Sequence, residues 1–223
     1  MAAGSRTKNR VSKAEQASAT RARVVTAATA LLLRDGFLTA TMAAIANEAG
    51  VAVQTLYLAF GSKTAILQAA FDTALTGGQG PEGILESEWF RGVLAESDGP
   101  RALALFCTGA HEVIARGAPL FDTMRAAAAD PEVAELLAHN KALRAHACGL
   151  VADALAKRHG FAAGLSAADA AVILYTVVSE DSFLLMVTER SWPAERWLHW
   201  TTTTCLTHLF PNHPMDAAGE GPA

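Results

Sequence analysis

Three glycines, Gly36, Gly50 and Gly61, each follow a short segment with helical periodicity, and they constrain the possible folds more than any other feature. Glycine often ends a helix because it adopts positive φ angles without strain. The pattern predicts a helix over residues 20–35, a second that begins after Thr39 or Thr41, and a third over residues 53–60. The second and third are separated by a turn of only a few residues.

The apolar residues in these segments recur at the spacing of one helix face. In the third segment Leu56 and Phe60 are four residues apart and face inward, so Gln54, Tyr57 and Leu58 fall on the opposite face. Ser62 is a suitable N-cap for a fourth helix that continues to Leu75. Two short helices joined by a tight turn, the second of them amphipathic, are typical of a helix-turn-helix.

The charge is distributed unevenly along the chain. The 223 residues have a formal net charge of −4, yet residues 1–70 hold eight basic and three acidic side chains. This asymmetry predicts a polyanionic partner for the N-terminal part. Residues 1–19 are expected to form a flexible basic arm with Arg6, Lys8, Arg10 and Lys13.

The remainder of the chain is also predicted to be helical. Residues 77–83 form a glycine-rich boundary, and no later segment alternates with the period of a strand. The fold class is therefore all-α, with an N-terminal three-helix helix-turn-helix domain over residues 20–71, a larger helical domain over residues 72–210 and a flexible tail over residues 211–223. The expected helices of the larger domain cover residues 84–95, 100–116, 119–129, 131–159, 166–191 and 193–210.

The predicted third helix has side chains suited to reading DNA in the major groove. Gln54 can pair with adenine, and Thr55 offers a hydroxyl and a methyl group. Tyr57 and Lys63 suit phosphate oxygens. Gln54 is equally compatible with a solvated surface position, and Tyr57 with a core position.

Several residues recur at fixed spacing over residues 20–71: Gly36-Phe37, Thr41, Ile45-Ala46, Ala49-Gly50-Val51, Leu56-Tyr57, Phe60 and Ser62-Lys63. With these residues the segment closely resembles the DNA-binding domain of TetR/AcrR-type transcriptional regulators. The chain departs from that pattern at Ala43, Ala52, Leu58 and Ala59, which leaves Val53, Gln54, Thr55 and Leu58 to read bases. The resemblance implies a homodimer on a double-stranded DNA operator, with DNA contacts from Thr41, Val53, Gln54, Thr55, Tyr57, Leu58 and Lys63.

The same resemblance implies a larger domain that binds an effector and dimerises through its last two long helices. A small apolar or amphipathic effector would then release a repressor from a palindromic operator. The residues that the resemblance places around the effector cavity are Trp89, Phe106, Cys107, His111, Phe121 and Tyr175. Each is also compatible with ordinary core packing, and the cluster of Trp192, Trp197 and Trp200 is expected to pack in the dimer.

Two alternatives remain: a regulator that responds to a protein partner, and a helical enzyme, for which no catalytic constellation is found. No metal site or cofactor is expected, because His111-Glu112 lacks the second histidine of an HExxH motif and His139 and His146 have no third ligand. The apolar stretch over residues 170–187 is interrupted by Glu180 and Asp181, so we expect a core or interface helix and no membrane span. Cys107, Cys148 and Cys205 are predicted to be buried reduced thiols of a cytoplasmic protein.

Overall fold

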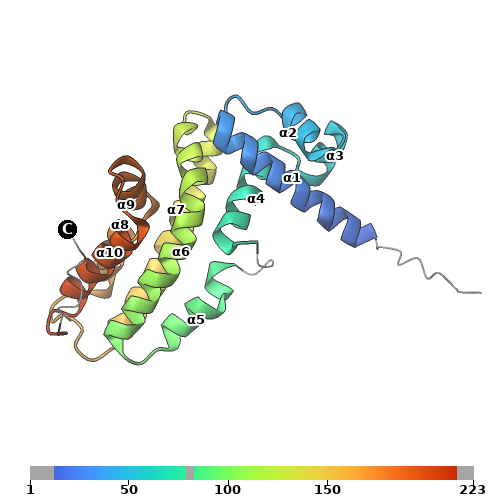
Figure 1. Ribbon diagram of the computed structural model, residues 1–223. Coiled ribbons are helices and arrows are strands. Elements are labelled where there is room, and N and C mark those ends of the chain that lie inside the picture. The colour runs from blue at the N-terminus through green and yellow to red at the C-terminus, as the bar shows by residue number, and fades with distance from the viewer. Residues whose placement is uncertain (1–12, 79–82, 215–223) are drawn as a thin grey trace, which may run out of the picture. The chain divides into compact units, whose positions relative to one another are not determined.

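The computed structural model describes residues 13–78 and 83–214, and all regular structure within these ranges is helical (Figure 1). The chain forms two compact units, residues 1–70 and residues 71–223. The boundary lies within one helix, α4 (Lys63–Thr76). The predicted all-α fold class is confirmed.

Unit 1 contains α1 (Lys13–Asp35), α2 (Met42–Ala49), α3 (Val53–Phe60) and the first half of α4. Helix α1 begins at Lys13, whereas the sequence predicted a flexible arm to residue 19. Residues 14–19 are exposed and lack a buried face, but Ala, Glu and Gln have high intrinsic helix propensity and extend the helix. Arg6, Lys8 and Arg10 lie outside the described residues.

The helix-turn-helix has the predicted connections. Thr41 is the N-cap of α2, and its Oγ1 accepts a hydrogen bond from the backbone N–H of Ala44. Gly50, with φ of 65°, turns the chain between α2 and α3 and donates its N–H to Asn47 O. Ile45, Ala46 and Leu56 are buried against the interior of unit 1. The turn therefore presents α3 with one face inward and the other outward.

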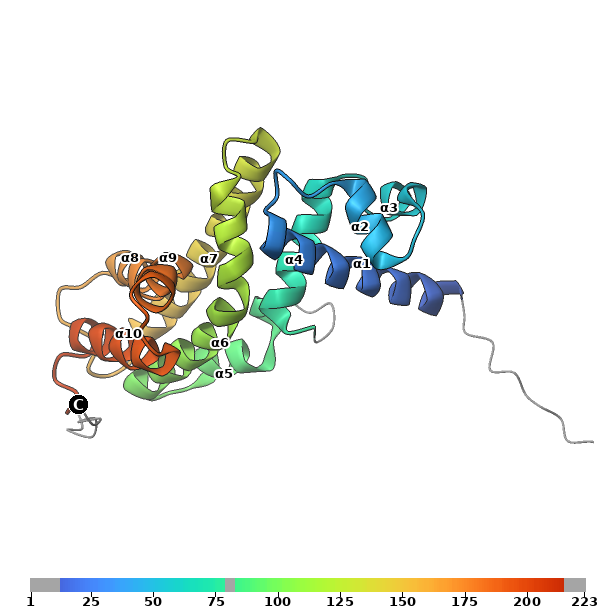
Figure 2. The same cartoon turned by 45° about the horizontal axis from the view of Figure 1, so that its top comes forward.

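Unit 2 contains the second half of α4, a 3-10 turn (Ile84–Glu86) and helices α5 to α10, which Figure 2 shows from a second direction. Its helices are α5 (Glu88–Ala95), α6 (Gly99–Ala126), α7 (Pro131–Leu155), α8 (Ala167–Val177), α9 (Glu180–Phe183) and α10 (Ala194–Leu209), with a π-helical turn over Leu184–Glu189. Helix α7 packs against α6 and α8, and α10 packs against α6. The 3-10 turn and the Ser87 cap replace the start of the predicted helix over residues 84–95.

Helix α6 is continuous, which corrects the prediction of two helices divided before Pro119. Pro119 is exposed and lies inside the helix. Its neighbours Ala118, Leu120 and Phe121 are buried. Burial on both sides of the proline compensates for the backbone hydrogen bond that it cannot donate.

The prediction of one helix over residues 166–191 is also wrong. The structure has a break after Val177 where the sequence predicted a continuous helix. Ser179 starts α9 as its N-cap, and its Oγ accepts a hydrogen bond from Ser182 N. The segment Ala167–Glu189 has the length and hydropathy of a membrane span, with 39% of its most apolar window buried. The break makes it three short elements of a folded unit, which does not fit a continuous span.

Candidate functional site

Helix α3 exposes the face that the sequence assigned to DNA. Leu58 is 81% exposed, Tyr57 52% and Val53 38%, and Gln54 is also exposed. Leu56 on the other side is fully buried. Tyr57 is therefore a surface residue rather than the core tyrosine that the sequence also allowed.

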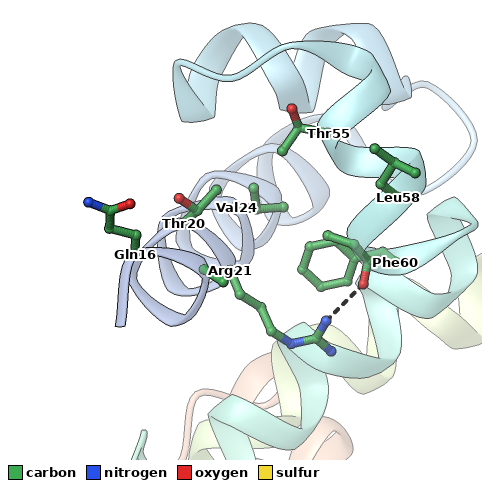
Figure 3. A pocket seen from close by; sticks show the side chains of 9 residues that line it. Gln16, Thr20, Arg21, Val24, Thr55, Leu58 and Phe60 are labelled. Atoms are coloured by element: carbon green, nitrogen blue, oxygen red, sulfur yellow. Dashed lines mark hydrogen bonds between the residues drawn. The ribbon is translucent and has the colours of Figure 1, made fainter. Parts of the chain in front are cut away.

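A shallow hollow of about 320 Å³ lies between α1 and α3 (Figure 3). Thr55 and Leu58 of α3 line one side of it, and Thr20 and Val24 of α1 line the other. The hollow is mainly apolar, so the apolar surface of Leu58 continues beyond α3.

Arg21 holds the end of α3 in place. Its guanidinium donates a hydrogen bond from Nη1 to Ala59 O at 3.1 Å and lies 4.2 Å from the centre of the Phe60 ring. The dashed line in Figure 3 marks this hydrogen bond. Arg21 thus neutralises part of the negative C-terminal end of the helix. Sequence reasoning did not single out Arg21, because its partner is 38 residues away.

Lys63 has a structural role that the sequence did not suggest. Its Nζ donates to Phe37 O at 2.6 Å and to Ala40 O at 2.9 Å, and it lies 4.1 Å from the centre of the Phe37 ring. These contacts join the start of α4 to the loop before α2. Lys63 therefore helps to position the helix-turn-helix, and its phosphate contact stays a prediction.

The helix-turn-helix has no cationic side chain of its own. Residues 36–62 contain no Lys or Arg, and Glu48 is their one charged residue. Ala52, the N-cap of α3, makes no side-chain capping hydrogen bond. The exposed face of α3 is therefore neutral and largely apolar.

The residues predicted to line an effector site divide into two groups in unit 2. Phe106, Cys107 and Phe121 are buried in α6. Trp89, His111 and Tyr175 are partly exposed. The Trp89 ring lies against Gly109, where any Cβ would collide with it.

His111 lies in an aromatic cluster that the sequence did not reveal. Its ring centre is 5.8 Å from that of Trp197 and 6.3 Å from that of Phe183. Its Nδ1 is buried and has no hydrogen-bond partner among the described residues. Trp197 is fully buried and donates from Nε1 to Ser182 Oγ at 3.1 Å. The prediction that Trp197 packs in a dimer is therefore wrong, because its ring lies inside the unit.

A second polar group of unit 2 is the ion pair between Arg144 of α7 and Glu180 of α9. Arg144 Nε lies 3.0 Å from Glu180 Oε2, and both side chains are largely buried. The Arg144 guanidinium also donates to Tyr175 O at 2.8 Å and lies 4.0 Å from the centre of the Tyr175 ring. Burial raises the pKa of Glu180, although Arg144 opposes that shift. Tyr175 thus contacts Arg144, whereas His111 contacts Phe183 and Trp197.

The three cysteines are buried and free, as the sequence predicted. Burial raises the pKa of the Cys148 thiol to about 12. Within residues 13–78 and 83–214, no group of three or more His, Cys, Asp or Glu side chains is placed to hold a metal ion.

Comparisons with known proteins agree with this architecture. The family model described as bacterial regulatory proteins, tetR family, matches residues 24–70. A search of curated proteins by sequence gives no match. The matched residues cover the second half of α1, all of α2 and α3, and the first half of α4.

Solved structures share the fold over most of the chain at low sequence identity. NalD of Pseudomonas aeruginosa, the secondary repressor of the MexAB-OprM multidrug efflux pump, is 17% identical with a TM-score of 0.66, over 89% of this chain and 99% of that one. A TetR-family transcriptional regulator from Syntrophomonas wolfei is 16% identical with a TM-score of 0.69, over 85% and 94%. A transcriptional regulator from Saccharomonospora viridis in complex with choline is 14% identical with a TM-score of 0.64, over 86% and 98%.

The helix-turn-helix, the match to the family model over it and the fold shared by the whole chain agree with one another. Residues 24–70 thus match the model of tetR-family bacterial regulatory proteins, and the chain has the fold of solved TetR-family transcriptional regulators.

Proposed function

We propose that the protein is a repressor that binds a palindromic operator as a homodimer and leaves it when a small molecule binds unit 2. The observation that carries the DNA-binding part is the exposed face of α3, with Val53, Gln54, Tyr57 and Leu58 outward and Leu56 buried. Thr41 and Thr55 complete the proposed contact set. A helix with this division of faces, held behind a tight turn, suits the major groove.

Homodimerisation is supported by α8. Ala168, Val172 and Thr176 are exposed at four-residue spacing, and Val172 is 64% exposed in the single chain. This stripe of small and apolar side chains is suited to close packing against a second copy. Sedimentation at micromolar concentration tests this, and a monomer would contradict it. A homodimer predicts an operator of two inverted half-sites.

Effector binding in unit 2 is supported by the His111 cluster. A buried imidazole nitrogen without a partner costs free energy, and it is suited to a polar group of a ligand. The surrounding rings of Phe183 and Trp197 suit an apolar or amphipathic molecule. We place the effector at this cluster and assign the protein to the cytoplasm, where it can reach DNA.

Helix α4 is the proposed link between the two functions. It is one continuous helix whose first half belongs to unit 1 and whose second half belongs to unit 2. Arg116 of α6 donates to Ala74 O and Leu75 O at the end of α4, and a Cβ at Gly117 would lie 2.6 Å from the Leu75 side chain. An effector that shifts α6 would therefore move the end of α4.

The test combines DNA selection with ligand binding. Full-length protein is used to select duplexes from a random-sequence pool, and fluorescence anisotropy then measures binding of the selected duplex. Choline, a compound bound by one structural neighbour, and a panel of hydrophobic cations and fatty acids serve as probes. A compound that releases the duplex and also stabilises unit 2 to heat supports the proposal.

Linkage gives a stricter test. The duplex must weaken binding of the releasing compound by the same factor by which that compound weakens DNA binding. His111→Leu is expected to weaken binding of the compound and to leave DNA affinity unchanged. Selection of no sequence from the pool would contradict the DNA-binding part. Equal compound affinity with and without DNA would contradict the effector part and favour regulation by a protein partner.

A further inference from the structure

The neutral face of α3 restricts which base pairs it can recognise. The helix reads VQTLYLAF, and residues 36–62 hold no Lys or Arg. Bidentate contact from Arg or Lys is the commonest way for a side chain to recognise guanine in the major groove. Neither helix of this motif has such a side chain. The remaining base contacts are those of an amide, a threonine and aliphatic groups.

We propose that α3 recognises thymine through its C5-methyl group, with Leu58 as the specificity-determining residue and Gln54 reading a neighbouring adenine. This inference rests on the proposed binding of α3 in the major groove. Thymine is the one base that presents a methyl group there, and apolar side chains contact it favourably. A glutamine amide pairs with adenine N6 and N7. The centre of each half-site should therefore consist of A·T pairs.

The geometry of the helix directs the side chains of Gln54 and Leu58 away from the buried face of α3. An α-helix turns by about 100° per residue, so positions two before and two after Leu56 both point about 160° away from it. These positions are Gln54 and Leu58, and Leu56 is the buried residue of α3. Both side chains thus extend away from the interior of unit 1, close to one another on the helix surface.

Leu58 makes little contact within unit 1. At 81% it is the most exposed of the large apolar side chains in the described parts of the chain. Leu58 and Thr55 line the same mainly apolar hollow beside α1, and Figure 3 labels both side chains. A methyl group seated on this surface is removed from water together with the end of the leucine. Burial of one such group corresponds to about 0.8 kcal/mol, or about fourfold in affinity.

The experiment removes single methyl groups from the DNA. The half-site is first obtained by selection from a random duplex pool with the full-length protein. Each thymine is then replaced in turn by deoxyuridine, which lacks only the methyl group. We expect one or more positions at which this replacement weakens binding about fourfold. A C·G pair at the same position should bind more weakly still, and 5-methylation of that cytosine should recover about the same factor.

Leu58→Ala identifies the side chain responsible. This variant should bind the thymine duplex about as weakly as the wild type binds the deoxyuridine duplex, and deoxyuridine should have no further effect on it. Leu143→Ala, at an exposed leucine of α7, is the matched control and should keep the fourfold sensitivity. Because both leucines are exposed, neither change should unfold the protein.

The outcomes separate this inference from the proposed function. A selected half-site that tolerates deoxyuridine at every thymine, or a Leu58→Ala variant with unchanged sensitivity, would overturn methyl recognition and leave operator binding intact. A half-site with G·C pairs at its centre would also overturn it. Failure to select any sequence would refute the DNA-binding proposal itself, and the inference would fail with it.

Discussion

The buried ion pair of Arg144 and Glu180 offers a quantitative test of how unit 2 is stabilised. We consider Arg144→Met, Glu180→Leu and the double variant. Replacing Arg144 leaves Glu180 buried, and its Oε2 has no hydrogen-bond partner among the described residues. Replacing Glu180 leaves Arg144 its hydrogen bonds to Tyr175 O and Val178 O and its stacking on Tyr175. The arginine variant should therefore be the less stable of the two.

The magnitudes follow from these contacts. Removing one partner of a buried pair typically costs about 3–5 kcal/mol, because the other charge is left in a poorly solvated site. In the double variant no buried charge remains, but the Tyr175 and Val178 carbonyls lose their donor. Buried acceptors without a partner cost about 1–3 kcal/mol. The double variant should therefore be more stable than Arg144→Met alone by about 2 kcal/mol, the difference between these two estimates.

The pH dependence provides a second signature. Burial raises the pKa of Glu180 above its unfolded value of 4.5, so the folded state holds this proton more tightly than the unfolded chain. The free energy of unfolding from this group is thus greatest below pH 4.5 and falls as pH rises through the folded pKa. Arg144 lowers the pKa, so Arg144→Met should extend this loss to higher pH, with a slope of up to about 1.4 kcal/mol per pH unit. The double variant should lack this contribution.

Tryptophan fluorescence is a suitable assay, because all four tryptophans lie in unit 2. Urea unfolding of each variant is followed from pH 4 to pH 8 at one protein concentration, so that dimerisation does not vary. The reasoning is refuted if the double variant is as unstable as the sum of the single variants, or if Arg144→Met loses no more stability with rising pH than the wild type.

Three other changes test separate parts of the structure. Lys63→Met should remove the bonds to Phe37 O and Ala40 O and cost unit 1 about 1.5–3 kcal/mol, seen as faster amide exchange over residues 36–45 with α10 unchanged. Burial raises the pKa of the Cys148 thiol, and a hydrogen bond with the Cys107 thiol, together with burial, raises the pKa of Cys205. Both thiols should therefore resist alkylation at pH 8 and react only in urea; labelling of the native protein would contradict this. Deleting residues 1–12 should flatten the salt dependence of DNA binding by about one unit of slope for each lost phosphate contact, whereas an unchanged slope would show that the arm makes none.

Local sequence patterns predicted unit 1 well, because its helices begin and end at residues whose chemistry is local. Thr41 and Ser62 cap helices through their own side chains. Gly50 and Gly61 have the positive φ angles that their positions required. The outward face of α3 followed from the spacing around Leu56 alone.

The errors arose where contacts distant in sequence decide the structure. The break after Val177 is stabilised by Arg144, which donates to the Tyr175 and Val178 carbonyls from 31 and 34 residues away. Pro119 lies inside α6 because the packing of Phe121 and its neighbours outweighs its effect on the backbone. Neither interaction can be predicted from the local periodicity of the sequence.

The candidate site was also predictable only in part. The sequence identified the exposed residues of α3. It could not show that Lys63 bonds two backbone carbonyls that lie before α2. It singled out His111 and not Phe183, whose position beside Trp197 depends on the packing of α9 against α10. Residues that act in pairs across helices require the tertiary structure.

The absence of Lys and Arg between residues 36 and 62 has a consequence for how salt affects the protein. Contacts to phosphates release counterions and weaken as salt is added, whereas contacts of neutral side chains to base edges release none. The base contacts of residues 36–62 should therefore contribute the same factor to affinity at every salt concentration, while phosphate contacts made elsewhere weaken. The part of the sequence preference that comes from these base contacts would be the same in concentrated salt as in dilute buffer.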